Sequence, residues 1–217
     1  DPTPDPPAAP VAGETIEGGF EDPETIRRVA ERADYLTFEI ELVDPDALEA
    51  VREETGVPVH PAPETLRTIQ DKLIQKRRLE EAGIPVPPFR AVDGRADLEA
   101  AIDEYGYPVM LKAREGGYDG RGNFPIRSPG DVEEALASAP GAMLVEQMVD
   151  FDRELSVIAV QGDDETATFP VGENVHEPEI LRQTIVPARA PDATRERAQS
   201  VAHDVLGEMV GRGAYGI

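Results

Sequence analysis

A lysine at the end of an apolar segment, followed by a glycine-rich loop, is the feature of this sequence best suited to chemistry. Val109–Leu111 is apolar, Lys112 follows it, and four glycines lie between Gly116 and Gly122. Glycine permits positive φ and close backbone approach, so successive N–H groups can face an anion. Lys112 would supply a point charge for phosphate oxygens, and Arg121 a second cation. We predict an anion site with Lys112 and Arg121 as its catalytic residues.

The glycine-rich loop matches neither of two common nucleotide-binding loops. No Gly-Lys-Ser/Thr ends it, which excludes a Walker A loop, and the segment that follows, Asn123–Ile126, is strand-like rather than helical. A glycine-rich hairpin between two strands can instead fold as a flap over the phosphates of a nucleotide. An ordinary surface hairpin is the alternative, but two cations in so acidic a chain favour the anion site.

Polar residues follow two further strand-like segments. Glu146 and Gln147 end an apolar segment and could bond an adenine, partly through backbone groups, while Glu154 lies eight residues on and could hold ribose hydroxyls. A carboxylate at a strand end is otherwise a solvated surface group. His176 lies in a third polar segment, although a lone histidine more often has a structural role. His60 and His203 are interpreted as structural.

The composition indicates a globular chain with an extreme acidic charge. Of 217 residues 40% are apolar, there is no cysteine, and 44 acids against 21 bases give a net charge of −23. The absence of cysteine excludes disulfides and thiolate sites, and the absence of a basic run argues against nucleic-acid binding. No apolar run reaches membrane-spanning length and no secretory signal opens the sequence, so a cytoplasmic location is expected. Acids spread over the whole chain favour a high-salt cytoplasm, where screening reduces self-repulsion.

Lysine usage is the sharper clue, because only three of the basic residues are lysines: Lys72, Lys76 and Lys112. A chain with so little surface lysine keeps these residues for specific work. We favour a functional role for Lys112 and Lys72, and interpret Lys76 as a helix-surface charge.

Alternating helical and strand patterns predict an α/β fold in two parts. The expected helices are 23–33, 46–54, 64–82, 97–105, 131–139 and 192–209. The expected strands are 35–43, 57–60, 109–114, 123–127, 142–147, 154–161 and 166–171, with a proline-rich joint at 84–89. Both ends are expected to be cut from a longer protein.

Four segments together resemble N5-carboxyaminoimidazole ribonucleotide synthetases, which are ATP-grasp enzymes of purine biosynthesis. These are Asp71–Lys76, Lys112–Asn123, Glu146–Ser156 and Glu173–His176. The string Gly-Tyr-Asp-Gly-Arg-Gly is the most specific of these marks. Other ATP-grasp enzymes share the broader fold but differ in this flap sequence. The resemblance implies that residues 1–63 are a partial doubly wound N-terminal domain and that residues 64–217 are most of an ATP-grasp domain with two α+β lobes.

The resemblance implies that ATP and bicarbonate carboxylate 5-aminoimidazole ribonucleotide through carboxyphosphate, with Mg²⁺ bridging the phosphates. Lys72 would contact ATP, Lys112 the phosphates, Glu154 the ribose and His176 the nucleotide site. The flap and the adenine pocket would comprise Gly117, Tyr118, Asp119, Gly120, Arg121, Gly122, Asn123, Glu146, Gln147, Met148 and Val149. The Phe38–Glu41 region would lie near the imidazole nucleotide, through either Glu39 or Glu41.

The resemblance also places some elements outside this sequence. A strand and glycine-rich turn would precede Asp1, and the metal-binding Glu, an Asn-Glu pair and a substrate arginine would follow Ile217, so no metal ligand is assigned here. We therefore expect these residues alone to lack synthetase activity. The alternatives are another ATP-grasp ligase, such as a formate-dependent phosphoribosylglycinamide transformylase, or an inactive nucleotide-binding fragment. A homodimer is possible.

Overall fold

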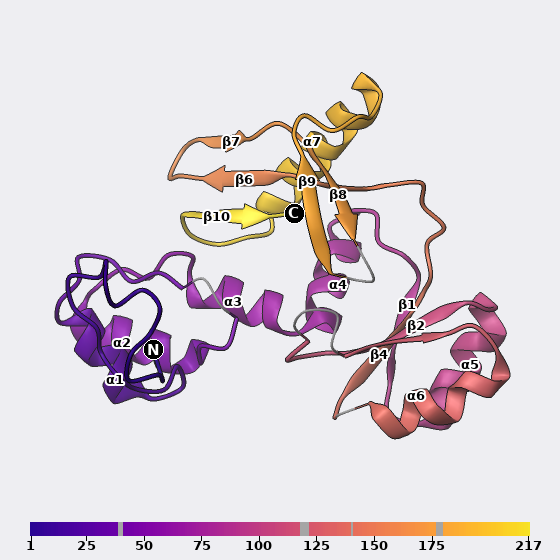
Figure 1. Ribbon diagram of the computed structural model, residues 1–217, viewed down its shortest axis with the longest axis horizontal. Helices are drawn as coiled ribbons and strands as arrows, with labels where there is room; N and C mark the ends of the chain where they lie inside the picture. The colour runs from indigo at the N-terminus through magenta and orange to yellow at the C-terminus, as the bar shows by residue number, and fades with distance from the viewer. Residues whose placement is uncertain (39–40, 118–121, 140, 177–179) are drawn as a thin grey trace. The chain divides into compact units, whose positions relative to one another are not determined.

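A computed structural model describes residues 1–38, 41–117, 122–139, 141–176 and 180–217. The chain divides into two compact units (Figure 1). The first comprises Asp1–Ile69 with Val210–Gly213, and the second comprises Gln70–Met209 with Ala214–Ile217.

Helices dominate the first unit. They are α1 (Pro23–Ala30), α2 (Pro45–Thr55) and most of α3 (Pro63–Gln70). Asp22 and Asp44 cap α1 and α2 with a side-chain oxygen, and a proline follows each cap, where its missing N–H does no harm. Gly56 ends α2 in the left-handed conformation, as its position after the helix predicts. The buried core of this unit includes Ile26, Leu48, Val51 and Leu66.

The predicted strands 35–43 and 57–60 are wrong as regular strands. Among the described residues of these segments, Leu36 and Val59 form a single parallel bridge, with Leu36 N bonded to Pro58 O and His60 N to Leu36 O, each at 2.8 Å. One bridged pair does not make a ladder. The parallel direction nevertheless agrees with the predicted doubly wound arrangement.

The first sheet of the second unit is antiparallel, with the order β1-β4-β2-β3. Its strands are β1 (Phe89–Val92), β2 (Val109–Ala113), β3 (Asn123–Ile126) and β4 (Met143–Gln147). Side chains alternate along a strand, so Val109, Leu111 and Ala113 share one face while Met110 and Lys112 share the other. The first face is buried with residues of α5 (Arg95–Tyr105) and α6 (Val132–Ser138), which follows the short 3₁₀ helix η1 (Pro129–Asp131).

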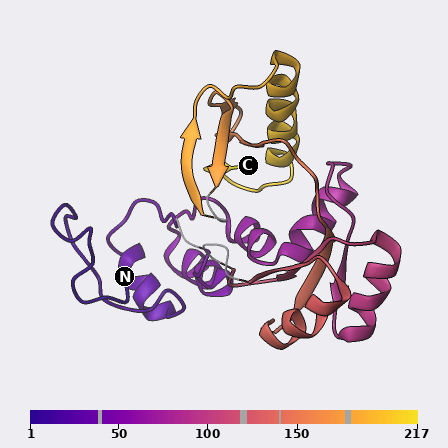
Figure 2. The ribbon, with the colours of Figure 1, turned by 45° about the vertical axis from the view of Figure 1, so that its right-hand side comes forward.

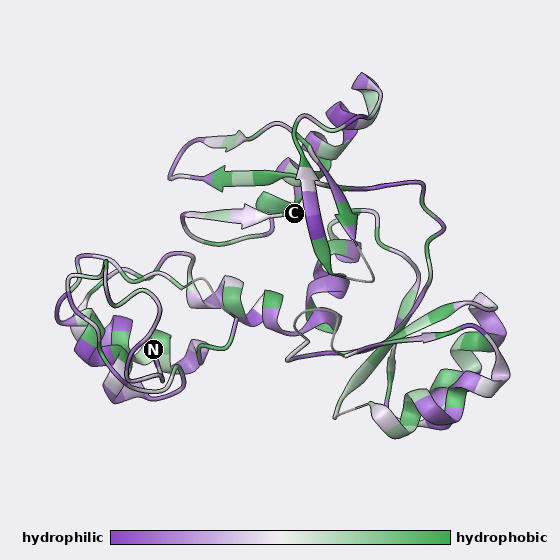
Figure 3. Ribbon diagram, viewed as in Figure 1, coloured by the Kyte–Doolittle hydropathy of each residue, from purple (hydrophilic) through white to green (hydrophobic). Residues whose placement is uncertain are grey.

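The helices on this sheet are amphipathic. Figure 1 places α5 and α6 on the same side of the sheet, and Figure 3 shows hydrophobic and hydrophilic residues alternating along both. Leu98, Ala101 and Ile102 of α5 are buried against Val109 and Val145. The sheet therefore has one face committed to its hydrophobic core and one face that carries Lys112.

The remaining strands form two three-stranded sheets, β5-β8-β9 and β10-β6-β7. The strands are β5 (Glu154–Ser156), β6 (Ile158–Gln161), β7 (Thr166–Thr168), β8 (Gly172–His176), β9 (Leu181–Ile185) and β10 (Gly213–Gly216). Helix α7 (Asp192–Leu206) lies beside them in both views (Figures 1 and 2), and its Ala202 and Leu206 are buried with Val157, Ala159 and Val171.

The predicted helix 64–82 is wrong as a single element. It divides at Asp71 into α3 and α4 (Lys72–Glu81). Asp71 has extended backbone, and its side chain accepts hydrogen bonds from Leu73 N and Ile74 N, which is N-cap geometry. A continuous helical pattern in the sequence did not reveal this interior cap.

Smaller corrections concern strands. The predicted strand 154–161 divides at Val157, whose N–H and C=O both bond Ile217, at 2.7 and 3.0 Å. The predicted strand 166–171 ends at Thr168, and the last residue of the joint 84–89 begins β1. The expected strands did not include β1, β8, β9 or β10. The other predicted helices and strands occur within a few residues of their expected bounds.

Candidate functional site

The hairpin formed by β2 and β3 positions Lys112. Lys112 pairs with Asn123 across the hairpin, and Ala113 N donates a 2.8 Å hydrogen bond to Gly122 O at the base of the loop. Gly116 and Gly122 have φ of 69° and 87°, a conformation that favours glycine. The described part of the loop therefore has the backbone geometry for which its glycines were singled out. Tyr118, Asp119, Gly120 and Arg121 lie outside the described residues.

Lys112 forms an ion pair with Glu146 of β4, which is also paired with a second lysine. Lys112 Nζ contacts Glu146 Oε1, and Lys76 Nζ of α4 lies 2.6 Å from Glu146 Oε2. In the β2–β4 register Lys112 is opposite Leu144 and Met110 is opposite Glu146, so Lys112 and Glu146 are diagonal neighbours on one face. We call Lys76, Lys112 and Glu146 the lysine–glutamate cluster.

The cluster is largely withdrawn from solvent. Glu146 is 8% exposed, and the side chains of Lys76 and Lys112 are 15% and 25% exposed. Burial opposes ionisation of Glu146, but Lys112 and Lys76 outweigh it and hold the pKa of that carboxyl below its ordinary value. Two cations sharing one carboxylate leave a net positive charge at the end of β2.

The position of Lys76 corrects its interpretation as a helix-surface charge. Its ammonium group pairs with Glu146 and lies 5.7 Å from the centre of the Phe89 ring. Lys72 and Lys76 are four residues apart in α4, which places them on one side of the helix. That spacing, in a chain with only three lysines, is a signal in the sequence from which Lys76 could have been found.

Glu154 and His176 come together on a different sheet. Glu154 of β5 lies opposite Asn174 of β8, and His176 Nδ1 is 3.7 Å from Glu154 Oε1. Asn174 Oδ1 accepts hydrogen bonds from Ser156 Oγ at 3.3 Å and Thr184 Oγ1 at 3.1 Å. Beside these residues is a hollow of about 230 Å³, lined by Ser156, Ile158, Phe169, Pro170, Gly172, Thr184 and Val186.

Glu173 is directed differently from its neighbours on β8. Its carboxylate accepts from Arg189 Nε at 3.1 Å and from Arg189 Nη2 at 2.7 Å, and Arg153 Nη1 lies 3.6 Å away. The hydrogen bonds from Arg189 lower the pKa of Glu173 to about 2. This clamp fixes the strand that presents Asn174 and His176.

The adenine-pocket candidates after Glu146 do not all face the lysine–glutamate cluster. The side chain of Gln147 donates to Tyr105 O at 3.3 Å, and its backbone N–H donates to Pro88 O at 2.9 Å. Glu146 and Gln147 therefore lie on opposite faces of β4. Met148 N donates to Pro108 O at 3.3 Å, and Val149 is exposed.

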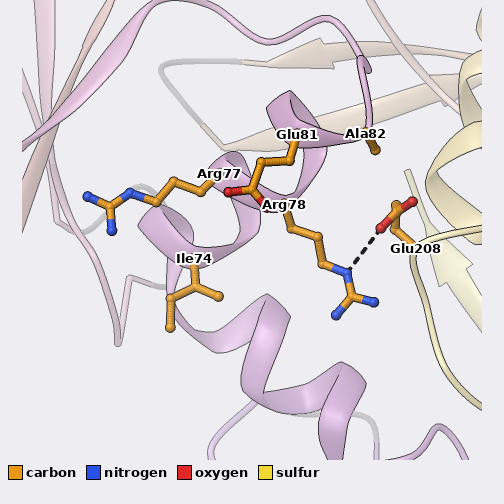
Figure 4. A pocket seen from close by; sticks show the side chains of 6 residues that line it. All are labelled: Ile74, Arg77, Arg78, Glu81, Ala82 and Glu208. Atoms are coloured by element: carbon orange, nitrogen blue, oxygen red, sulfur yellow. Dashed lines mark hydrogen bonds and ion pairs between the residues drawn. The ribbon is translucent and has the colours of Figure 1, made fainter.

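A hollow of about 560 Å³ lies on another side of α4. Figure 4 shows its lining residues, Ile74, Arg77, Arg78, Glu81, Ala82 and Glu208, with Arg78 Nε 3.2 Å from Glu208 Oε2. None of the site residues predicted from the sequence lines it. The size of a hollow therefore does not locate the charged cluster in this chain.

Comparison with known proteins identifies both parts of the chain. The ATP-grasp domain family matches residues 77–217, and the ribonucleotide synthetase preATP-grasp domain family matches residues 1–70. The chain therefore belongs to the ATP-grasp family. The predicted fold class, an α/β chain with an N-terminal preATP-grasp domain followed by an ATP-grasp domain, is confirmed.

The relatives narrow this class to one group of enzymes. The chain is 36% identical over 211 residues to N5-carboxyaminoimidazole ribonucleotide synthase of Bacillus subtilis, covering 96% of this chain and 55% of that protein. It is 38% identical over 205 residues to phosphoribosylaminoimidazole carboxylase of Ogataea methanolica, covering 93% and 38%. The chain thus spans about half, or less, of the curated relatives it matches.

A solved structure resembles nearly the whole chain. It is the N5-carboxyaminoimidazole synthase of Aspergillus clavatus in complex with ADP and 5-aminoimidazole ribonucleotide, with a TM-score of 0.89 and 35% identity. The similarity covers 97% of this chain and 56% of that one. The family resemblance stated from the sequence is confirmed by these relatives.

Two features are absent from the described residues. Among them, no helix is long and apolar enough to cross a membrane. In the same part of the chain, no group of three or more acidic or histidine side chains could hold a metal ion.

Proposed function

We propose that this chain carries the ATP site of an enzyme that carboxylates 5-aminoimidazole ribonucleotide with bicarbonate, with cleavage of ATP. One observation carries the proposal. Lys112 lies at the base of a glycine-rich hairpin, in a buried cluster with Glu146 and Lys76. The solved relative that holds ADP and 5-aminoimidazole ribonucleotide supports the choice of ligands.

The cluster suits a phosphate because its charge is shared. A phosphate oxygen near Lys112 Nζ would compete with Glu146 for that cation, and Lys76 would remain to neutralise the carboxylate. The buried glutamate then always keeps one cation. A buried carboxylate without a cation would cost several kcal/mol in a protein interior. Ammonium groups in a site with little water also interact strongly with the charge that develops during phosphoryl transfer.

The proposed reaction has two steps. The γ-phosphoryl group of ATP passes to bicarbonate, which gives carboxyphosphate and ADP. The amine of the imidazole nucleotide then attacks the carboxyl carbon, and the carbon–oxygen bond to phosphate breaks. Because carboxyphosphate hydrolyses readily, the site must exclude water during the reaction.

The remaining candidates take supporting roles in the proposal. Glu154 would hold the ribose, and His176, whose Nδ1 is 3.7 Å from Glu154 Oε1, would contact the nucleotide beside it. Lys72 would contact ATP, as would Gly117, Gly122, Asn123 and residues 146–149, while Arg121 would complete the flap. Bicarbonate as the carbon source, a homodimer, a cytoplasmic location and a domain boundary at residue 63 belong to the same proposal.

The proposal includes magnesium bound to the phosphates of ATP. It would neutralise phosphate charge during transfer. The described residues hold no group of side chains that fits a metal. No step is therefore assigned to a metal held by this chain.

The proposal is tested by substrate dependence. The protein is expressed from its complete reading frame and supplied with ATP, the imidazole nucleotide and either bicarbonate or formate. ADP release that requires both bicarbonate and the imidazole nucleotide is the expected result. A stoichiometric requirement for formate would replace the proposal with a transformylase. ATP binding without ADP release under any of these conditions would leave a nucleotide-binding protein and overturn the enzymatic proposal.

A further inference from the structure

Asp71 and Arg114 form a second charged contact between α4 and β2, outside the lysine–glutamate cluster. Asp71 is 5% exposed, and Arg114 follows Lys112 by two residues. Arg114 Nε donates to Asp71 Oδ1 at 3.0 Å, and Arg114 Nη2 contacts Asp71 Oδ2. This is a two-point arginine–carboxylate pair, which fixes orientation as well as distance.

The same carboxylate also begins the helix. Asp71 Oδ1 accepts from Leu73 N at 2.9 Å and from Ile74 N at 3.3 Å. Burial raises the pKa of Asp71, but the hydrogen bonds from Arg114 and from the two amides outweigh it, so the pKa is below its ordinary value. One buried ionised side chain therefore caps α4 and binds the end of β2.

The backbone of Arg114 completes the connection. Its carbonyl accepts from Lys72 N at 3.0 Å, and its N–H donates to Ala142 O at 3.1 Å. All of the first four amides of α4 are therefore occupied. Lys72 N bonds Arg114 O, Leu73 N and Ile74 N bond the Asp71 side chain, and Gln75 N bonds Asp71 O at 2.9 Å. Helix α4 can therefore serve an anion through its lysine side chains but not through its N-terminal amides.

The geometry points to a positioning role for this contact, which we name the Asp71–Arg114 anchor. We propose that it fixes the start of α4 against the end of β2, so that Lys72 and Lys112 converge on one phosphate group while Lys76 stays paired with Glu146. The inference rests on the proposed function, because it assumes that Lys72 and Lys112 serve a nucleotide. It assigns Asp71 and Arg114 as positioning residues that do not touch the ligand.

The test compares ATP with adenosine in variants of the anchor. Asp71→Asn keeps a good N-cap residue but removes the charge and the two-point pair. We expect ATP to bind roughly tenfold more weakly, about 1.4 kcal/mol, within the range of coupling between residues in one network. Adenosine, which has no phosphate, should have the same dissociation constant in the variant and the wild type when each is titrated directly by calorimetry.

A double-mutant cycle and a control complete the design. Arg114→Gln and the double variant should show non-additive losses of ATP affinity, and Arg114→Lys should restore part of the loss seen with Arg114→Gln. The control is Glu104→Gln, which removes the exposed Arg90–Glu104 pair on β1 and α5. The control should bind ATP as the wild type does. Thermal melts of each variant identify any that does not fold, in which case Arg114→Lys decides the question.

The outcomes separate the inference from the proposed function. If Asp71→Asn and Arg114→Lys bind ATP normally while Lys112→Ala does not, the anchor has no positioning role and the ATP site stands. Equal losses of ATP and adenosine affinity would make the anchor merely structural and would overturn the inference. Absence of ATP binding by the wild type would overturn both.

Discussion

In the proposed ATP site, two lysines share one buried carboxylate. Neither lysine could be buried alone without a large desolvation penalty, and Glu146 supplies the compensating charge for both. An incoming phosphate can take one of these lysines without leaving the carboxylate unpaired. The arrangement also explains why so acidic a chain uses lysine at this place.

Lys112→Ala should weaken ATP binding strongly. The substitution removes the cation at the base of the hairpin, and a hydrogen bond to a charged group contributes about 1.5–3 kcal/mol, or roughly 10- to 150-fold in affinity. Isothermal titration calorimetry of ATP measures the effect. Arg90→Ala on β1, which pairs with β4 and not with β2, is the control, because Arg90 is in an exposed pair with Glu104. Unchanged affinity in Lys112→Ala would refute the site.

Glu173→Gln should reveal the arginine clamp through its pH dependence. The pKa of Glu173 is about 2 in the folded chain, against an ordinary value of 4.5. The ionised clamp therefore stabilises the fold fully above pH 4.5, and this contribution disappears as the pH falls through that interval to about 2.

Thermal melts across this range measure the difference between wild type and Glu173→Gln. The variant should melt lower at neutral pH, and the gap should close as the pH falls. Glu165→Gln, at an exposed position between β6 and β7, is the matched control and should show no such gap. A gap for Glu173→Gln that stays constant with pH would contradict the clamp.

At the scale of elements, the breaks between helices and strands place the charged residues of the proposed site. The cap at Asp71 begins a new helix, and only that new helix brings Lys76 to Glu146. The hairpin of β2 and β3 likewise depends on its loop glycines. These interruptions determine where the charged residues meet.

Gly122→Ala should destabilise the hairpin. Gly122 has φ of 87°, and an added Cβ would lie 3.1 Å from the Cβ of Ala113. The left-handed conformation costs an alanine roughly 1–2 kcal/mol, and the close contact adds to this. Urea unfolding measures the change. Gly130→Ala is the control, because its Cβ would meet Ser128 Oγ at an ordinary 3.6 Å, and it should change stability by much less. Equal effects of the two substitutions would argue against the strained turn.

At the scale of the whole molecule, the net charge of −23 is the main source of electrostatic self-repulsion. Like charges repel in the compact state, and this self-repulsion weakens as salt shortens the range of each charge. Between about 0.1 M and 1 M salt the Debye length falls from about 10 Å to about 3 Å. The net charge therefore bears on solubility and stability, and it is no argument about the family or the proposed site.

Potassium chloride should therefore stabilise the protein. We expect the melting temperature to rise between low and molar KCl because screening relieves the acidic surface. Sucrose at matched molarity is the control, since it is excluded from protein surfaces without screening charge. A melting temperature that does not rise with KCl, or rises equally with sucrose, would contradict adaptation to a high-salt cytoplasm.

The sequence by itself determined the family, the hairpin and most of the helices. Gly-Tyr-Asp-Gly-Arg-Gly after a strand-ending lysine is local information, and so is Gly56, which ends α2. These features depend on residues a few positions apart. A single sequence therefore carries them directly.

Only the tertiary structure decided how the charges pair. Lys76 and Glu146 are 70 positions apart in the chain, and Asp71 and Arg114 are 43 apart, so no local pattern links them. The division of the helix at Asp71 also depended on Arg114, which stabilises the ionised cap from another element. A lysine on a polar helix has the same local pattern whether it faces water or a buried carboxylate, because only the packing of α4 against the sheet distinguishes the two.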